Sequence, residues 1–527
     1  MKILVSDSLE QSCIDLLERE GFQVDNRPGI NAETLKSVIG DYDALIVRSA
    51  TKVTADVIEQ AHALKLIGRA GTGVDNIDTK AATRRGILVM NTPGGNTISA
   101  AEHSVSLLLS LARNIPQANM SLRQGVWDRK KYIGTEVFEK TLGVVGLGKI
   151  GREVAARCKG LGMRVIGYDP VLNPEIAEKL NIELVTLREI YRRSDFMTFH
   201  TPLTSETKNL INAKTLAQCK KGVRIINCAR GGIVDEHALL EALESGQVGG
   251  AALDVFEQEP PGDSPLLQHR HVVATPHLGA STEEAQEKVA IQIAHQIADA
   301  LHDRGYTGVV NGGALHMTMR AEVRPYLLLA EKLGSFVSQV SLGKLKSVTV
   351  AAFGEPAVSS LELLKAGVLK GILAHVLTEP VNFINAPFLA EEMGIATMEE
   401  KVRDGENYGN FLRIRYQTDM EAKEVAGTVF EPATIRFVRL DEFRFEIKPE
   451  GFLLIYTNQD KPGVLARVGS ILAKHQVNIA GVSLGRTAAG ATALTIMNID
   501  SELPPDGWEE LGKETLVSHV KQVFLES

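Results

Sequence analysis

The stretch Thr141–Gly151 reads T-L-G-V-V-G-L-G-K-I-G and decides the fold of this region. An apolar run typical of a strand leads into Gly146, Gly148 and Gly151, and a helical pattern follows. In such a turn the first glycine permits the sharp bend, the second lets backbone approach a pyrophosphate, and the third lets helix and strand pack closely. The helix N-terminus then points at the phosphates. The stretch predicts a Rossmann-type dinucleotide site, although a glycine-rich turn without a ligand stays open on the motif alone.

The next expected strand selects the kind of dinucleotide. It ends in Asp169, which Pro170 follows. A carboxylate at this point accepts hydrogen bonds from the ribose hydroxyls and repels a 2′-phosphate, whereas an arginine nearby would accommodate that phosphate. The sequence therefore favours NAD over NADP.

Composition and charge exclude several classes of protein. The 527 residues suit about three or four domains at roughly 150 residues each. Hydrophobic residues make up 44%, charged residues 23% and aromatic residues 5%, and the formal charge is −8 without a long Lys or Arg run. This balance is that of a globular protein and disfavours nucleic acid and anionic membranes as partners.

The cysteines indicate the redox compartment. They are scattered, with no C-x-x-C pair, so we predict no metal site and no disulfide framework. The chain opens as a strand, not as a signal peptide. Its longest apolar runs, such as Val105–Ala112, are far shorter than the ~20 residues of a membrane span. We expect a soluble, cytoplasmic protein.

Strand and helix patterns alternate from Met1 to about Asp303 and predict two α/β units with parallel sheets. Long helices are expected near Ser99–Arg113 and over Thr282–Leu301. The expected strands are Ile3–Val5, Ala44–Val47, Leu64–Ile67 and Ile87–Val89, then Gly143–Val145, Val165–Tyr168, Phe196–Phe199, Val223–Asn227, Gly250–Val255 and Val272–Thr275.

The pattern changes after Asp303. Gly305–Met319 reads as a linker, Arg324–Leu342 as a helix and Thr434–Lys448 as alternating strands. From Gly451 the order strand, helix, strand, strand, helix, strand predicts an α+β domain of ferredoxin-like order.

Three later segments end strands of the second unit and carry polar side chains. They are I-N-C-A-R-G-G (226–232), L-D-V-F-E-Q-E-P (253–260) and A-T-P-H-L-G-A-S-T (274–282), which supply Arg230, Asp254, Glu259 and His277. Doubly wound sheets bind ligands at these strand ends. An arginine can hold a carboxylate, a histidine titrates near neutral pH, and a paired glutamate raises the pKa of the histidine. This set suits hydride transfer involving a 2-hydroxy acid, although a lone histidine is more often structural.

These residues resemble the D-isomer-specific 2-hydroxyacid dehydrogenases. The similarity spans the α/β region through G-L-G-K-I-G, H-T-P-L-T, C-A-R-G-G, D-V-F-E-Q-E-P and T-P-H-L-G-A-S-T. It implies His277 as acid and base, Glu259 as its partner, and Arg230 on the substrate carboxylate and reacting oxygen. It also implies Asp254 at the nicotinamide and Thr201–Pro202 at the adenine side. The other cofactor contacts implied are Thr72, Lys149, Ile150, Cys228, Ala229, Gly279 and Ala280.

The resemblance also implies the domain arrangement. A Rossmann-type doubly wound cofactor domain, 96–282, is inserted in a flavodoxin-like α/β substrate domain made of 1–95 and 283–304. An α+β intervening domain, 305–450, and a ferredoxin-like βαββαβ domain, 451–527, follow.

Two arginines at neighbouring strand ends, Arg48 and Arg69, suggest an anion pocket in a chain of net charge −8. Surface arginines paired with acids are the alternative. These segments, with N-T-P-G-G-N (91–96) and W-D-R-K-K (127–131), resemble the branch of the family that oxidises 3-phospho-D-glycerate to 3-phosphohydroxypyruvate, the entry to serine synthesis. The resemblance implies Arg48 and Arg69 on the phosphate, Asn96 near the substrate, and Arg129 reaching a neighbouring subunit's site.

The stretches Y-T-N-Q-D-K-P-G-V-L-A-R-V (456–468) and H-Q-V-N-I-A-G (475–481) resemble the ACT regulatory domain. The resemblance implies inhibition by L-serine, with Asn458, Asp460 and Asn478 as effector residues. A capped helix with satisfied turn polars is the alternative.

The segment 305–450 resembles the family's intervening domain through 324–334 and 426–430. Glu431–Pro432 stand where relatives usually carry Gly-Gly, and we assign this region no ligand residues. We expect a homo-oligomer, a dimer or, through ACT pairing, a tetramer. The competing hypotheses are a dehydrogenase of glycerate or another 2-hydroxy acid, and an NAD-sensing protein without activity.

Overall fold

The computed structural model describes residues 1–313, 315, 320–403, 408–430 and 433–526. Two compact units are present: Met1–Asn91 with Ile293–Ser527, and Thr92–Gln292. Glu431–Pro432 and, in the predicted linker, residues 314 and 316–319 lie outside the described residues.

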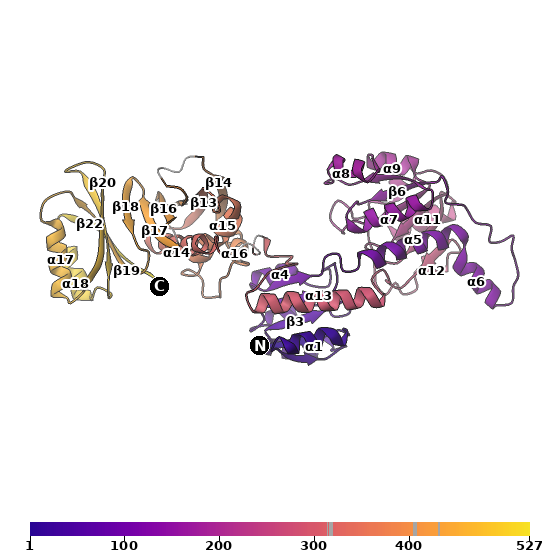
Figure 1. Ribbon diagram of the computed structural model, residues 1–527, viewed down its shortest axis with the longest axis horizontal. Coiled ribbons are helices and arrows are strands. Elements are labelled where there is room, and N and C mark those ends of the chain that lie inside the picture. The colour runs from indigo at the N-terminus through magenta and orange to yellow at the C-terminus, as the bar shows by residue number, and fades with distance from the viewer. Residues whose placement is uncertain (314, 316–319, 404–407, 431–432, 527) are drawn as a thin grey trace. The chain divides into compact units, whose positions relative to one another are not determined.

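The unit Thr92–Gln292 is built on a seven-stranded parallel sheet of order β12-β11-β10-β9-β6-β7-β8. This order, which reverses at β6, is that of a doubly wound dinucleotide fold. Figure 1 shows the helices of this unit gathered around strand β6. The strands are β6 (Thr141–Val145), β7 (Arg164–Tyr168), β8 (Glu183–Leu184), β9 (Phe196–Phe199), β10 (Val223–Asn227), β11 (Val248–Leu253) and β12 (Val272–Ala274). The helices are α5 (Thr97–Arg113), α6 (Ile115–Arg123), α7 (Lys149–Gly160), α8 (Pro174–Lys179), α9 (Leu187–Arg193), α10 (Ala213–Leu216), α11 (Glu236–Glu244) and α12 (Pro265–Gln268).

Helices cover both faces of this sheet, so its central strands are apolar throughout. All four residues of β9 are buried. Met197 and Phe199 pack in a core with α9 to α11, while Phe196 belongs to a second core with α5 and α7. The strand ends, where apolar residues give way to polar ones, are therefore the places where side chains can meet a ligand.

The other unit begins with a five-stranded parallel sheet of flavodoxin-like order β2-β1-β3-β4-β5. Its strands are β1 (Lys2–Val5), β2 (Gln23–Asn26), β3 (Ala44–Val47), β4 (Leu66–Arg69) and β5 (Leu88–Asn91). Its helices are α1 (Gln11–Arg19), α2 (Ala32–Val38), the 3₁₀ turn η1 (Ile39–Asp41), α3 (Ala55–Glu59) and α4 (Thr79–Arg84). The long helix α13 (Glu283–Leu301) brings Ile293 and Ile297 against Gly68, where a Cβ would collide with both side chains.

Part of the predicted linker pairs with this sheet. Met90 and Val309 form an antiparallel bridge, and the Val310 N–H donates to the Val89 carbonyl at 2.8 Å. The Asn311 side chain accepts from the Val89 N–H at 2.8 Å. Residues 308–311 thus cover the β5 edge, although their composition predicted only a linker.

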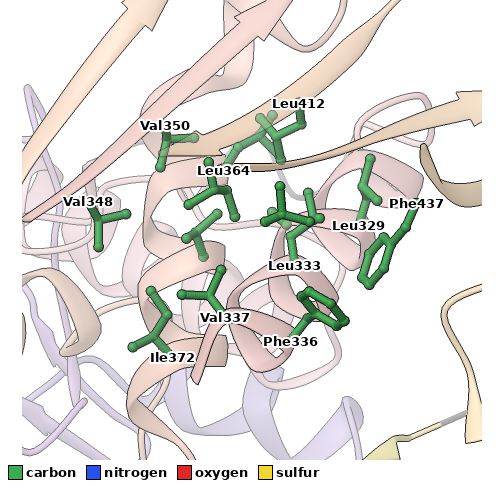
Figure 2. Close-up of a cluster of buried hydrophobic side chains, with 14 of the residues drawn as sticks. Leu329, Leu333, Phe336, Val337, Val348, Val350, Leu364, Ile372, Leu412 and Phe437 are labelled. Atoms are coloured by element: carbon green, nitrogen blue, oxygen red, sulfur yellow. The ribbon is translucent and has the colours of Figure 1, made fainter. Parts of the chain in front are cut away.

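The segment after the linker forms a six-stranded sheet of order β14-β13-β15-β16-β17-β18, packed against helices. Figure 2 shows Leu333 of helix α14 (Arg324–Val340) near Leu412 of this sheet, and Phe336 of the same helix beside Phe437, within one buried cluster. The strands are β13 (Leu345–Phe353), β14 (Ala396–Lys401), β15 (Phe411–Thr418), β16 (Ala422–Phe430), β17 (Thr434–Leu440) and β18 (Phe443–Ile447). The helices are α14 (Arg324–Val340), the 3₁₀ turn η3 (Val358–Ser360), α15 (Leu361–Leu373) and α16 (Ala386–Glu392).

The last segment has the order β19 (Gly451–Gln459), α17 (Val464–Lys474), β20 (Ile479–Arg486), β21 (Thr492–Ile499), α18 (Pro505–Gly512) and β22 (Val517–Leu525). Its antiparallel sheet of order β20-β21-β19-β22 is ferredoxin-like, as predicted. One sheet face packs on α17 and α18, and the other contributes to the α14 core.

The predicted fold class is confirmed, and the differences lie at element ends and at sheet edges. The predicted helix over Arg324–Leu342 ends at Val340, and the strand predicted from Leu64 starts at Leu66. The edge strands β2 and β8 were not predicted, because their residues are polar or half-exposed and lack an apolar run.

Candidate active site

The glycine turn after β6 has the geometry that a pyrophosphate needs. Gly146 has φ +91°, and a Cβ there would lie 2.5 Å from the His200 carbonyl oxygen. A Cβ at Gly151 would collide with the Gly146 carbonyl. Gly148 precedes α7, and a Cβ there would meet no atom within 4 Å. The backbone is thus tightly packed at two glycines and open at the third, which fits close approach of a phosphate.

Asp169 closes β7 beside this turn. Its Oδ2 accepts from the Leu147 N–H at 2.8 Å, and its Oδ1 accepts from Val171 and Leu172 at 2.9 and 3.0 Å. The backbone holds the carboxylate at the edge where a ribose would lie. Thr201, which follows β9, has a buried Oγ1 without a hydrogen-bond partner among the described residues. The residues therefore fit a dinucleotide.

The other predicted cofactor residues surround the same edge of the sheet. Burial raises the pKa of the Cys228 thiol to about 12, so it stays protonated and forms an unreactive wall. The Ala229 N–H donates to Asn227 Oδ1 at 3.1 Å, which shapes the loop after β10. Lys149 and Ile150 begin α7, Pro202 follows β9, and Gly279 and Ala280 follow β12.

His277 and Glu259, from two separate loops, form a pair. The His277 Nδ1 lies 2.7 Å from Glu259 Oε2, and the side chains are 46% and 38% exposed. The hydrogen bond to Glu259 raises the pKa of His277 above its usual value, although burial opposes this shift. Partial burial disfavours the Glu259 carboxylate, yet contact with His277 leaves its pKa lowered. With Nδ1 donating to Glu259, Nε2 is the nitrogen that can exchange a proton with a ligand.

Asp254 closes β11 and organises the turn that carries His277. Its side chain is fully buried, and its backbone carbonyl accepts from the His277 N–H at 2.9 Å. The carboxylate accepts from the Leu278 and Gly279 N–H groups at 2.8 and 2.9 Å. Burial opposes its ionisation, but hydrogen bonds from His103 and Thr275 leave its pKa lowered. Asp254 is thus a charged support beneath the histidine.

Arg230 follows β10 at the same edge of the sheet. Its Nη1 donates to the Ala229 carbonyl at 2.6 Å, and its charge lowers the pKa of His277 against the effect of Glu259. A cavity of about 510 Å³ opens beside the pair, walled by Phe256, Pro260, Pro261, Leu267 and Pro276 and reaching Glu259 and His277. A base, its carboxylate partner and a cation therefore meet beside an apolar cavity.

In the other unit, the structure brings Arg48 and Arg69 together. Strand register pairs Val47 with Arg69, and the Arg69 Nε donates to the Arg48 carbonyl at 3.3 Å. Arg69 also donates to the Gly73 carbonyl. Thr72 accepts from Asn91 Nδ2 through its carbonyl at 2.5 Å.

Sequence reasoning missed two residues that hold Arg48. The Asp7 carboxylate accepts from the Arg48 N–H at 2.6 Å and from the Thr51 hydroxyl at 2.6 Å. Asn76 Nδ2 donates to the carbonyls of Arg48 and Thr51 at 2.8 and 2.6 Å. Asp7 lies just beyond β1, so the rule that strand ends carry functional polar groups could have found it.

The remaining substrate residues lie apart from the strand ends. Asn96 precedes α5, and Arg129 lies on the exposed segment that follows α6. Trp127 and Ile133 on this segment are 75% and 78% exposed.

The predicted effector residues do not converge on one another. Asn458 is buried, accepts from the Thr495 hydroxyl at 3.1 Å and donates to the Gln459 carbonyl at 2.8 Å. Asp460 accepts from Arg486 at 2.8 Å and from the Gly490 N–H at 3.0 Å, while Asn478 donates to Asp500 at 2.8 Å. Each therefore has its own partners, as the alternative of satisfied turn polars describes.

Solved structures share the fold of the α/β region. A formate dehydrogenase from Staphylococcus aureus in complex with NAD aligns with TM-score 0.55 and 30% identity, covering 59% of this chain and 99% of that chain. D-lactate dehydrogenase from Escherichia coli aligns with TM-score 0.53 and 27% identity, covering 59% of this chain and 100% of that chain. Residues 105–279 match the family model "D-isomer specific 2-hydroxyacid dehydrogenase, NAD binding domain". Fold and site thus define an NAD-dependent 2-hydroxyacid dehydrogenase, and the predicted cofactor is confirmed.

The C-terminal segments narrow the assignment. Residues 322–441 match the D-3-phosphoglycerate dehydrogenase intervening domain, and residues 452–509 match the ACT domain. A D-3-phosphoglycerate dehydrogenase of Synechocystis sp. is 44% identical over 97% of this chain and 92% of its own length. The human D-3-phosphoglycerate dehydrogenase is 41% identical over 98% of both chains. The chain belongs to the D-3-phosphoglycerate dehydrogenase family, and the predicted relationship is confirmed.

In the part of the chain that the structure describes, no helix is long and apolar enough to cross a membrane. The same residues contain no group of three or more His, Cys, Asp or Glu placed to hold a metal ion.

Proposed function

We propose that this enzyme oxidises 3-phospho-D-glycerate to 3-phosphohydroxypyruvate with NAD, the first step of L-serine synthesis. The observation that carries the chemistry is the His277–Glu259 pair at 2.7 Å, at the ligand-binding edge of a dinucleotide fold. The substrate assignment is supported by relatives of that name, which align over nearly the whole chain.

The reaction removes a hydride from the C2 carbon and a proton from its hydroxyl. NAD, when bound, supplies the hydride acceptor. His277 Nε2 takes the hydroxyl proton as a general base, and Glu259 stabilises the imidazolium that forms. Arg230 binds the substrate carboxylate and polarises the reacting oxygen. In the reverse direction the protonated His277 returns the proton to the oxygen.

The NAD residues have separate tasks in this proposal. The glycine turn, with Lys149 and Ile150 at the start of α7, binds the pyrophosphate, and Asp169 binds the ribose hydroxyls. Thr201 and Pro202 border the adenine side, where the unpartnered Thr201 Oγ1 can gain a hydrogen bond. Asp254 contacts the nicotinamide in this proposal, and the further cofactor contacts are Thr72, Cys228, Ala229, Gly279 and Ala280.

Arg48 and Arg69 bind the substrate phosphate in this proposal, because they lie at neighbouring strand ends and supply two guanidinium groups. Asn96 lies near the substrate, and Arg129 acts in the site of a second copy. The large exposed apolar side chains beside Arg129 support this, because such surfaces are typical of interfaces. The proposed assembly is a homodimer, or a tetramer through paired ACT domains.

The ACT domain gives the enzyme a small-molecule control site, for which we propose L-serine as the effector with Asn458, Asp460 and Asn478 as its contacts. All four cysteines are free thiols, which suits the reducing cytoplasm as the place of action.

The test is a parallel assay with 3-phosphoglycerate, glycerate and lactate, each with and without L-serine. We expect the phosphorylated acid to give the highest kcat/KM and serine to lower it. Higher kcat/KM with glycerate would favour the alternative, another D-2-hydroxyacid dehydrogenase. No NAD reduction with any 2-hydroxy acid, despite NADH binding, would favour a sensing protein without activity.

Arg48→Ala sharpens the substrate assignment. Loss of one charged contact to phosphate is expected to raise KM for 3-phosphoglycerate by about 10- to 100-fold, and KM for glycerate far less. Arg19→Ala, on the exposed face of α1, is the matched control. Equal effects of Arg48→Ala on both substrates would contradict a phosphate role.

A further inference from the structure

His103, near the middle of α5, makes a contact with the active-site support that no motif indicated. Its Nε2 lies 3.1 Å from Asp254 Oδ1 and 3.2 Å from the Thr275 hydroxyl. The two partners are 151 and 172 residues further along the chain. The side chain is 20% exposed, so these hydrogen bonds form in a largely desolvated setting.

The turn that His103 contacts holds His277 in an uncommon conformation. His277 has φ +54°, in the left-handed region that a residue with a Cβ rarely adopts. The Asp254 carboxylate binds both sides of the turn: the Thr275 hydroxyl at 2.6 Å before the histidine, and two N–H groups after it. An uncommon backbone conformation persists only when the surrounding structure maintains it. The Asp254 carboxylate makes all of these bonds at once, so it can do this only in one orientation.

Backbone hydrogen bonds already join the turn to the end of β11, and His103 adds a side-chain bond from a second rigid element. Thr275 and the N–H donors belong to the turn and move with it. His103 belongs to a 17-residue helix whose buried face lies in the core of the unit. A donor on this helix therefore restrains the orientation of the Asp254 carboxylate, in addition to its attachment to β11, and through it the position of His277.

We propose that His103 is a positioning residue: its Nε2–H donates to Asp254, and this bond orients the turn 275–279 so that His277 reaches the substrate oxygen. The inference rests on the proposed proton transfer by His277. A space-filling residue on a helix face would have no need of a donor at this atom, whereas a positioning residue depends on it.

Three variants separate these roles. His103→Gln keeps an N–H donor near the place of Nε2, His103→Asn has the same amide on a shorter side chain, and His103→Leu has no donor. Glu102→Gln is the control, because Glu102 is adjacent in sequence and its side chain is 62% exposed. Steady-state kcat and KM are measured for 3-phosphoglycerate with NAD, and for an unphosphorylated 2-oxo acid with NADH.

We expect kcat to fall about 10- to 100-fold in the Asn and Leu variants, because small misplacement of a catalytic group has effects of this size. KM for either substrate is expected to change less than about threefold, and His103→Gln to retain kcat within about threefold. Asn or Leu variants within twofold of wild type, or a Gln variant as slow as the Asn variant, would overturn the inference. If His103→Leu fails to fold, the comparison of Asn with Gln stands alone.

The two substrates distinguish failure of this inference from failure of the proposed function. The turn serves any 2-oxo acid, so the kcat losses are expected to be similar with both, even if the phosphorylated acid proves a poor substrate. Crystal structures of wild type and His103→Asn give a reading independent of turnover. An unchanged turn 275–279 in the Asn variant would overturn the inference.

Discussion

The ends of β10 to β12 and the two ACT segments around Asn458 and Asn478 share one signature in sequence, polar side chains beside an apolar strand, yet their geometry differs. His277 and Glu259 meet at 2.7 Å with both side chains partly exposed. Asn458, Asp460 and Asn478 each bond to a separate partner, and Asn458 is buried. The first set meets in one partly exposed pair, whereas each side chain of the second set already has a partner of its own within the domain.

Sheet topology explains why polar residues at strand ends meet in one region and not in the other. A parallel sheet directs all its carboxyl ends to one edge, so residues from distant segments meet there. In the antiparallel ACT sheet, neighbouring strands end at opposite edges, and Asn458 and Asn478 lie near opposite edges, each with a separate partner. Polar residues at strand ends are therefore expected to converge on one site in a parallel sheet. In an antiparallel sheet the same sequence pattern does not by itself predict a shared site.

The largest expected effect is at the catalytic turn. His277→Ala removes the proposed proton carrier and should lower kcat by about 10²- to 10⁴-fold. Steady-state NADH formation measures it, and His237→Ala, on the exposed face of α11, is the control. Turnover near that of wild type would exclude His277 from the mechanism, and the strand ends of β10 to β12 would then differ from the ACT domain in geometry alone.

A smaller effect, visible in pH profiles, is expected from Glu259→Gln. Glu259 raises the pKa of His277, so its removal lowers that pKa. Reduction of the 2-oxo acid needs protonated His277, and its activity should be lost at lower pH than in wild type. Oxidation needs neutral His277 and should persist to lower pH. Profiles of kcat/KM in both directions measure the shift, with exposed Glu257→Gln as control; coincident profiles would contradict the pairing.

The smallest expected effect is in the ACT domain and concerns its stability. Asn458→Ala leaves the buried Thr495 hydroxyl without its acceptor and should lower the free energy of unfolding by about 1–3 kcal/mol. Asn478→Ala, whose bond to Asp500 is exposed, should change it by less than about 0.5 kcal/mol. Denaturant unfolding monitored in parallel measures both. Equal effects would contradict the view that the buried Asn458 bond stabilises the domain more than the exposed Asn478 bond.

Much of the site was predictable because it depends on local patterns. The turn Gly146–Gly151 needs small residues for steric reasons that act over a few positions. The polar residues that follow β10, β11 and β12 were visible because buried strands leave continuous apolar runs. Edge strand β2 and the pairing of 308–311 with β5 were not predicted, because neither segment has an apolar run long enough to indicate a strand.

The turn at Gly146–Gly151, the order of the α/β elements and the preference for NAD were predictable from the sequence alone, which also indicated Arg230, Glu259 and His277 as candidate site residues. These follow from backbone sterics and from burial along single segments. Only the tertiary structure decided that Asp254 supports the His277 turn, that His103 reaches it from α5, and that the ACT residues have separate partners. The physical reason is that hydrogen bonds between distant segments depend on how those segments pack, and no local pattern encodes that packing.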